Sequence, residues 1–236
     1  MTTPTSFDPI WEDGIYGRGR QLNRYPFDSV VAFVTRSRHS TAEPIRVVEV
    51  GCGAGNNVWF LAREGCLAAG IDASPTAIDT ARDRLRSDGL VADLRVGDFS
   101  RLPWSDASFD LAIDRAAITH TNRSSAAIAI SELHRVLRPG GLLFFNPFAS
   151  DHTSATSGRR GEDGVRVGIS EGTLQGVGQV SFYDVDALEN LFRSGWRIVN
   201  REHVTVVSDD GSRQCEWRVI AERLAPPQRR PDRGTA

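Results

Sequence analysis

Short apolar runs alternate with longer amphipathic segments from residue 46 to about residue 148. The apolar runs, which predict β-strands, fall at residues 46–50, 67–71, 92–96, 111–113 and 141–146. Apolar residues at helical spacing predict helices near residues 27–38, 56–64, 75–87 and 124–137. Strand–helix alternation of this kind is typical of βαβ units, so we predict an α/β, doubly wound and mostly parallel sheet with helices on both faces.

The pattern changes after residue 148. Residues 150–180 are rich in Gly, Ser and Thr and contain Arg159, Arg160 and Arg166, so we expect a loop or lid inserted after the fifth strand. A helix is predicted at about residues 184–193. Two strand-like runs, 197–207 and 213–223, are expected to form an antiparallel edge of the sheet.

The length of the chain, 236 residues, suits one domain with a substantial core. We assign residues 1–225 to this domain, with residues 1–40 as an N-terminal helical cover, and we expect residues 226–236 to be a disordered tail. No apolar run approaches the roughly 20 residues needed to span a bilayer, and the first residues lack the features of a signal peptide. Three cysteines without metal-ligand spacing fit a reducing compartment. A cytoplasmic protein without a membrane partner is therefore expected.

The charge of the chain argues against a nucleic-acid partner. The formal net charge is −2, whereas nucleic-acid-binding domains usually carry a strongly basic face. The sequence leaves the oligomeric state open between monomer and homodimer.

The most informative segment is residues 47–57, Val-Val-Glu-Val-Gly-Cys-Gly-Ala-Gly-Asn-Asn. A strand that carries Glu49 turns over Gly51, Gly53 and Gly55 before a helix begins. Glycines are needed where the backbone bends sharply or approaches a ligand closely. The spacing G-x-G-x-G differs from the dinucleotide fingerprint G-x-G-x-x-G, whose helix N-terminus faces a pyrophosphate. A carboxylate beside the turn would repel a diphosphate and attract an ammonium group.

Two further acids end the next two predicted strands. Asp72 comes about 20 residues after the glycine loop, where a strand-end carboxylate can bind both hydroxyls of a ribose. Asp98 ends the third strand and is followed by Phe99, so it is placed to meet an adenine amino group. Each Asp alone is explained more simply as a helix cap or a turn residue. Together with Glu49, at successive strand ends, they indicate a nucleoside site.

These features resemble the class I family of methyltransferases that depend on S-adenosylmethionine (SAM), over about residues 46–148. The resemblance rests on the glycine loop, Asp72, Asp98, Leu102-Pro103-Trp104 with Ser108-Phe109-Asp110, and the stretch LHRVLRPGG at residues 133–141. That last stretch is typical of the small-molecule members. The resemblance implies a Rossmann-like sheet of seven strands with one antiparallel strand near the C-terminal edge. It also implies SAM as cofactor and S-adenosylhomocysteine (SAH) as product.

The resemblance assigns roles to individual residues. Glu49 and the glycine-loop backbone would hold the methionine end of SAM, Asp72 the ribose, and Asp98 with Phe99 the adenine. The full set of expected cofactor-binding residues is Glu49, Gly51, Cys52, Gly53, Gly55, Asp72, Ala73, Asp98, Phe99 and Asp114. Cys52 is interpreted as a packing residue and not as a nucleophile.

Substrate-facing residues are expected after the fourth and fifth strands, because ligands of such sheets bind outside the carboxyl ends of the strands. Topology places Asp114 and Arg115 near the sulfonium. His120 resembles a histidine of many small-molecule members and is our candidate catalytic base, although it could instead cap a short helix or pack beneath the site. His152, just past the fifth strand, is a second candidate for substrate binding.

The N-terminal residues 15–26 resemble the cover of some bacterial small-molecule methyltransferases. Tyr16 and Arg24 are our candidates there for closing the pocket and binding a substrate anion; packing against the sheet edge is the alternative. Two interpretations are also open for the arginines of residues 150–180. They bind an acidic substrate, or they belong to a loop exposed to solvent.

The predicted function is transfer of a methyl group from SAM to an oxygen, nitrogen or carbon of a small molecule, such as a sugar or secondary metabolite, without a metal ion. Alternatives are another reaction on this scaffold, such as a cyclisation, a non-catalytic SAM-binding module, or an NAD-dependent oxidoreductase. A nucleic-acid or protein methyltransferase is a further alternative. Many nucleic-acid methyltransferases carry an Asn/Asp-Pro-Pro-aromatic motif after the fourth strand. This chain has Asp114-Arg115-Ala116-Ala117 there, which argues against that class.

Overall fold

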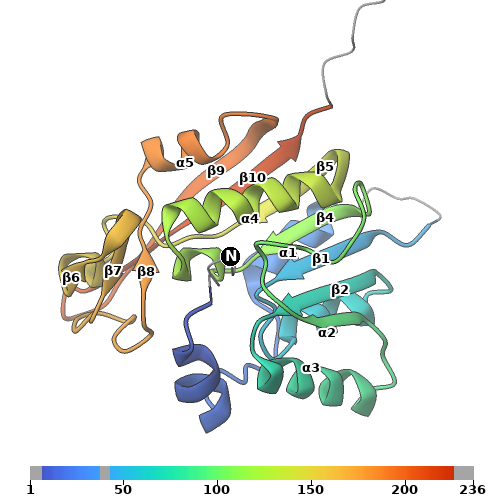
Figure 1. The fold of residues 1–236 in the computed structure, drawn as a ribbon, viewed down its shortest axis with the longest axis horizontal. Coiled ribbons are helices and arrows are strands. Elements are labelled where there is room, and N and C mark those ends of the chain that lie inside the picture. Colours follow the sequence, from blue (N-terminus) through green and yellow to red (C-terminus); the bar gives the residue numbers. More distant parts are fainter. Residues whose placement is uncertain (1–6, 38–42, 226–236) are drawn as a thin grey trace, which may run out of the picture.

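The fold is known from a computed structural model, which describes residues 7–37 and 43–225. The expected tail at residues 226–236 lies outside the described residues. The main strands are β1 (Arg46–Val50), β2 (Leu67–Asp72), β3 (Asp93–Val96), β4 (Phe109–Asp114), β5 (Leu137–Phe145), β9 (Trp196–Val207) and β10 (Arg213–Arg223). They form one sheet of seven strands in the order β3-β2-β1-β4-β5-β10-β9 (Figure 1).

The sheet is parallel from β3 to β5, and β10 runs antiparallel to both of its neighbours. The predicted Rossmann-like α/β fold with an antiparallel strand near the C-terminal edge is thereby confirmed. β5 begins earlier than its apolar run suggested, because Leu137 already pairs with Phe109 before a register shift.

Helices cover both faces of the sheet, as Figure 1 shows. On one face pack α1 (Asp28–Ser37), α2 (Asn56–Arg63) and α3 (Pro75–Ser87), and on the other α4 (Arg123–Val136) and α5 (Val185–Leu191). The start of α3 follows from its sequence, because Ser74 caps the amide of Ala77 and Pro75 occupies the first turn. None of the helices in the described part of the chain is both long and apolar enough to cross a lipid bilayer.

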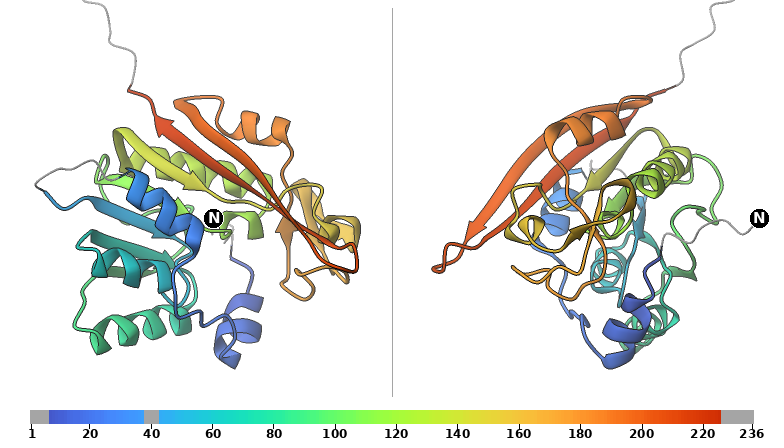
Figure 2. Two further views of the ribbon diagram at one scale, coloured as in Figure 1. Left: turned by 180° about the vertical axis from the view of Figure 1, so that it is seen from behind. Right: turned by 60° about the vertical axis from the view of Figure 1, so that its left-hand side comes forward.

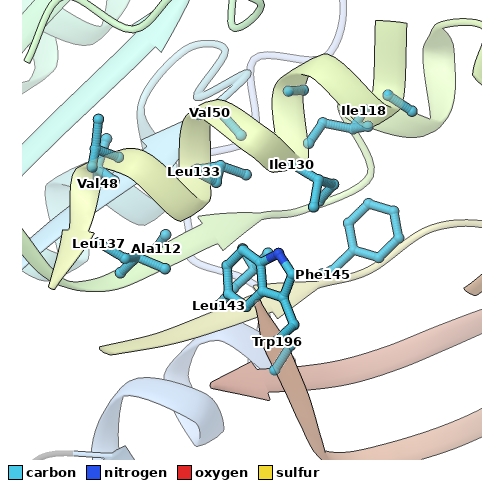
Figure 3. Packing of buried hydrophobic residues seen from close by; sticks show 14 of the residues in the cluster. Val48, Val50, Ala112, Ile118, Ile130, Leu133, Leu137, Leu143, Phe145 and Trp196 are labelled. Carbon is cyan, nitrogen blue, oxygen red and sulfur yellow. The ribbon is translucent and has the colours of Figure 1, made fainter. Parts of the chain in front are cut away.

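The larger hydrophobic core lies between the sheet and α4. Ile130 and Leu133 of α4 point toward Val48, Ala112 and Leu143 of the central strands (Figure 3). Because these strands are covered on both faces, their side chains are apolar in succession and do not alternate with polar ones.

Residues 150–180, which we expected to be a loop or lid inserted after the fifth strand, contain short elements of secondary structure. They contain two short strands, β6 (Arg159–Arg160) and β7 (Val165–Val167), that form a small antiparallel sheet with β8 (Val180–Ser181). A separate hydrophobic cluster supports this insertion, made of Phe148, Ala155, Ile169, Leu174, Val180 and Phe182. The insertion and the N-terminal turns lie on the side where the parallel strands end (Figures 1 and 2).

Candidate active site

A cavity of about 240 Å³ lies at the carboxyl ends of the parallel strands. Glu49, Asp72 and Asp98 all line it, as the sequence predicted for acids at successive strand ends. The other predicted residues that line it are Tyr16, Gly51, Cys52, Gly53, Ala73, Phe99, Arg115 and His120. The cavity is thus built at the ends of four strands, together with the N-terminal segment and the insertion.

The glycine loop forms the floor of this cavity. Gly51 and Gly53 adopt left-handed backbone conformations, with φ of 62° and 51°. A side chain at Gly51 would collide with Ala117, and one at Gly53 would collide with the hydroxyl of Tyr16. Glycine is therefore required both by the backbone conformation and by the lack of space.

Glu49 is the most unusual carboxylate of the site. It is 2% exposed, and its Oε1 accepts a hydrogen bond of 2.6 Å from Asn57. Its Oε2 is buried and has no hydrogen-bond partner among residues 7–37 and 43–225. Burial raises the pKa of Glu49 to about 8, despite the bond from Asn57. A cationic ligand group beside such a buried oxygen gains binding free energy, because it supplies the partner that the oxygen lacks.

Asp72 and Asp98 are partly bound by backbone amides. Asp72 accepts hydrogen bonds from Gly53 at 2.8 Å and Ser74 at 2.9 Å, and burial raises its pKa. Asp98 accepts one from Ser100 at 2.7 Å. A carboxylate has about four acceptor sites, so both can still accept bonds from ligand hydroxyl or amino groups.

Two predicted cofactor-binding residues do not line the cavity. Gly55 caps α2, and a Cβ there would lie 2.6 Å from the Cβ of Ala81, so this glycine serves the packing of α2 against α3. Asp114 is fully buried and binds the amides of Ala117 and Ile118, at 3.0 and 2.8 Å. Burial raises the pKa of Asp114 to about 6. The loop after β4 folds back over the carboxylate of Asp114. The amides of this loop bind the carboxylate, so it does not face the ligand.

Cys52 lines the cavity but is buried, and burial raises the pKa of its thiol well above the usual value. A thiol in this state is a poor nucleophile. The interpretation of Cys52 as a packing residue therefore agrees with its surroundings.

His120 lies in a short turn after β4, with its ring 9% exposed to the cavity. Its Nδ1 is 3.1 Å from the carbonyl oxygen of Gln179, and the side chain of Gln179 donates to the carbonyl of His120. Burial lowers the pKa of His120 to about 4, so the ring is neutral near pH 7. A neutral ring whose Nδ1–H donates to Gln179 carries its lone pair on Nε2.

Two predicted substrate residues lie away from the cavity. His152 is fully buried under the insertion, where its Nδ1 accepts from the amide of Ser154 and its Nε2 is 3.3 Å from the hydroxyl of Thr173. Arg24 is exposed and lies over the ring of its neighbour Tyr25. His152 is held at the start of a short helical turn, and Arg24 is exposed to solvent.

Arg115 lines the cavity but is already engaged. Its guanidinium stacks on Phe27 at 4.2 Å and forms an ion pair of 3.6 Å with Glu216. Burial lowers the pKa of Arg115, although Glu216 acts in the opposite direction.

The N-terminal segment contributes residues that the sequence did not single out. Trp11 lies edge-on to His120, with ring centroids 4.7 Å apart. Glu12 accepts hydrogen bonds from Ser74 and Thr76 at the start of α3, and Asp8 accepts one from the amide of Gln179. These two carboxylates tie the cover to both sides of the cavity. Their partners are distant in sequence, so no local signal could have revealed them.

A second polar cluster lies outside the cavity. Asp151, His203 and Cys215 have potential ligand atoms within 4.8 Å of one another. Arg213 already binds Asp151 at 2.8 Å, so the charge that a cation would neutralise is compensated. We assign this cluster no role in the active site.

Comparison with known proteins places this geometry in context. A family model described as a methyltransferase domain matches residues 48–145. Malonyl-[acyl-carrier protein] O-methyltransferase of Enterobacter lignolyticus is 30% identical over 136 residues, which is 58% of this chain and 50% of that protein. Methyltransferase GfsG of Streptomyces halstedii is 37% identical over 143 residues, 59% of this chain and 46% of that protein. The chain thus spans about half the length of these curated relatives.

Residues 48–145 thus match a methyltransferase domain, and the fold around them is the one seen in class I SAM-dependent methyltransferases. A SAM-dependent methyltransferase from Methanosarcina mazei has the same fold, with a TM-score of 0.68, 22% identity, and coverage of 86% of this chain and 100% of that one. The [4+2]-cyclase SpnF also shares the fold, with a TM-score of 0.62, 19% identity, and coverage of 84% and 81%.

The residues of the cavity fit SAM, the cofactor of class I SAM-dependent methyltransferases. The oxygen of Glu49 that has no hydrogen-bond partner among the described residues suits an ammonium group, and Gly51 and Gly53 line the cavity. Asp72 and Asp98 provide acceptors at the next two strand ends.

Proposed function

We propose that this methyltransferase transfers the methyl group of SAM to an oxygen, nitrogen or carbon atom of a small molecule, such as a sugar or secondary metabolite, without a metal ion. The observation that carries the proposal is the convergence of Glu49, Asp72 and Asp98 with His120 on one cavity. A cytoplasmic location and a small-molecule partner, without nucleic acid or membrane, are part of the same proposal.

The cofactor side of the cavity comprises the glycine loop and the three acids. In this proposal Glu49 holds the ammonium of the methionine end, Asp72 the ribose hydroxyls, and Asp98 with Phe99 the adenine. Tyr16 lines the cavity, and burial raises the pKa of its hydroxyl, so that it stays protonated as a donor.

SAM supplies a methyl carbon on a sulfonium, and the electron pair of the broken carbon–sulfur bond remains on sulfur in SAH. The protein's main contribution is alignment, which can supply on the order of 7–11 kcal/mol when the reacting atoms are held in line. Trp11 and Phe148 flank His120 and help to exclude water. His120 accepts the proton of the attacking group on Nε2.

The test is incubation of the purified protein with SAM and a panel of hydroxyl, amine and activated-carbon acceptors, followed by mass spectrometry. The proposal expects an acceptor that gains one CH₂ unit in stoichiometric amount with SAH, and unchanged turnover with a chelator present. Turnover abolished by the chelator and restored by magnesium would overturn the metal-independent mechanism.

The same experiment separates the alternative functions. A product of unchanged mass would indicate a rearrangement such as a cyclisation, for which the shared fold of SpnF provides a precedent in fold only. Tight SAH binding without any turnover would indicate a non-catalytic SAM-binding module.

A further inference from the structure

One part of the cavity lining is apolar and largely aromatic. Trp11 comes from the N-terminal turns, His120 from the turn after β4, and Phe148 from the chain after β5. Their rings contact one another, with centroid distances of 4.7 Å for Trp11–His120 and 6.1 Å for His120–Phe148. Aromatic side chains that line a cavity favour flat, apolar ligands.

The insertion extends this wall. Leu174 and Val177 line the cavity, and both pack in the hydrophobic cluster of the insertion together with Phe148. Residues 150–180 therefore form part of the cavity lining, because the hydrophobic cluster that stabilises the small sheet also contributes side chains to the cavity.

The charges around the cavity disfavour an anionic acceptor. Four acids line it: Asp8, Glu49, Asp72 and Asp98. Among the described lining residues Arg115 is the sole arginine, and it is engaged by Phe27 and Glu216. Three of these acids are assigned to the cofactor, and Asp8 accepts a hydrogen bond from Gln179 beside His120. A carboxylate or phosphate beside His120 would therefore find an acid nearby and no uncommitted arginine among the described lining residues.

The arginines of the insertion do not change this balance. Arg159 and Arg160 are exposed, and Arg166 donates to the carbonyl of Ser157. None of the three lines the cavity. The acidic substrate considered for these arginines is therefore not supported by where they lie.

We propose that the methyl acceptor is an uncharged molecule with a flat, apolar body that presents a hydroxyl group to Nε2 of His120. This inference rests on the proposed methyl transfer and adds the substrate class. In the step, the hydroxyl oxygen forms the new bond to carbon, the carbon–sulfur pair stays on sulfur, and the hydroxyl proton moves to Nε2.

The test uses two probes that share the same hydroxyls and differ in charge: methyl 3,4-dihydroxybenzoate and 3,4-dihydroxybenzoate. Each is titrated calorimetrically into the SAH-loaded protein near pH 7. We expect the neutral ester to bind at least about tenfold more tightly than the anionic acid, because the acid must bring its charge into a cavity whose sole described lining arginine is already bound to Phe27 and Glu216.

A matched pair of variants tests whether the cavity causes this preference. Thr173 is exposed and lines the cavity, whereas Gln175 is exposed and does not. Thr173→Arg places a cation at the acceptor wall and is expected to narrow the ester-to-acid ratio about threefold or more. Gln175→Arg adds the same charge to the same loop and should leave the ratio unchanged.

The outcomes distinguish this inference from the proposed function. Failure of SAH itself to bind would refute the proposed function. With SAH bound, an acid that binds as tightly as the ester, or failure of both probes to bind, would overturn the inference about the acceptor. An equal response of the ratio to Thr173→Arg and Gln175→Arg would also overturn it.

Discussion

At the scale of single residues, Glu49 shows how burial prepares a binding group. One of its oxygens binds Asn57, the other has no partner in the described protein, and burial raises the pKa of the carboxyl to about 8. In the ligand-free protein the group is therefore mostly protonated at pH 7. An ammonium group placed beside it favours the ionised form and lowers the pKa.

Binding of SAH at pH 7 should therefore release up to one proton from Glu49. Titration calorimetry in two buffers with different ionisation enthalpies measures this release. In Glu49→Gln the release should be lost and the affinity should fall about tenfold or more. Equal proton release in both proteins would contradict the assigned role of Glu49.

The same shift has a consequence for stability. The folded protein keeps a proton on Glu49 that the unfolded chain loses above pH 4.5, so the free energy of unfolding falls as pH rises from about 4.5 to about 8. Denaturant titrations of wild type and Glu49→Gln without ligand should show this fall in wild type, and a smaller one in the variant. Parallel curves for the two proteins would argue against a buried protonated carboxyl.

His120 provides a second prediction at this scale. His120→Ala should lower kcat by about 100-fold or more, with SAH affinity changed less than about threefold, because the proton acceptor is lost and the cofactor side is untouched. Because burial lowers the pKa of His120 to about 4, its neutral form prevails above that pH. The contribution of His120 to kcat should thus be constant from pH 8 to 6 and decline only as pH falls toward about 4. A His120-dependent loss of rate between pH 7 and 6 would contradict the buried, neutral ring.

At the scale of elements, the sequence predicted the longer elements and missed the short strands of the insertion. The helix at residues 75–87 and the strands at 46–50 and 213–223 have the predicted bounds. The helix has apolar residues at helical spacing, and the strand at 46–50 is a short run buried on both faces. The strands of the insertion have two or three residues, too few for any periodicity to emerge. Its hydrophobic cluster depends on contacts with Phe148, which the local sequence does not reveal.

The packing of α2 on α3 can be tested at Gly55. Gly55 and Gly89 both have left-handed backbones, with φ of 74° and 66°, but only at Gly55 would a Cβ meet a neighbour, Ala81 at 2.6 Å. Urea denaturation should show that Gly55→Ala lowers the free energy of unfolding by about 2–4 kcal/mol, against about 1 kcal/mol for Gly89→Ala. Equal losses would mean that the helices tolerate the added methyl group.

The N-terminal cover can be tested at Glu12, whose hydrogen bonds from Ser74 and Thr76 lower its pKa. Glu12→Gln should weaken SAH binding about threefold to tenfold and speed proteolysis within residues 7–25, because the cover loses its bond to α3. Asp13→Asn, at the exposed neighbouring position, is the matched control and should change neither. If both variants behave alike, the contact with α3 does not hold the cover.

At the scale of the whole molecule, strand order explains why part of the site could be predicted. Parallel strands end at one edge, so acids at the ends of β1, β2 and β3 had to converge there. The sequence pattern does not predict the direction in which the chain leaves each strand. Asp114 turns back into its own loop and His152 is buried by the insertion, although both were expected at the ligand. The cover and insertion residues Trp11 and Gln179 reach the site only through tertiary packing.

The central claim is that acids from three strand ends form one adenosyl-sulfonium site, and calorimetric titration of the purified protein with SAH against NAD tests it most directly. The account predicts a single saturable site for SAH, weakened about tenfold or more by Asp72→Asn, and no measurable heat of binding for NAD. Absence of SAH binding, or binding of NAD at equal affinity, would contradict it.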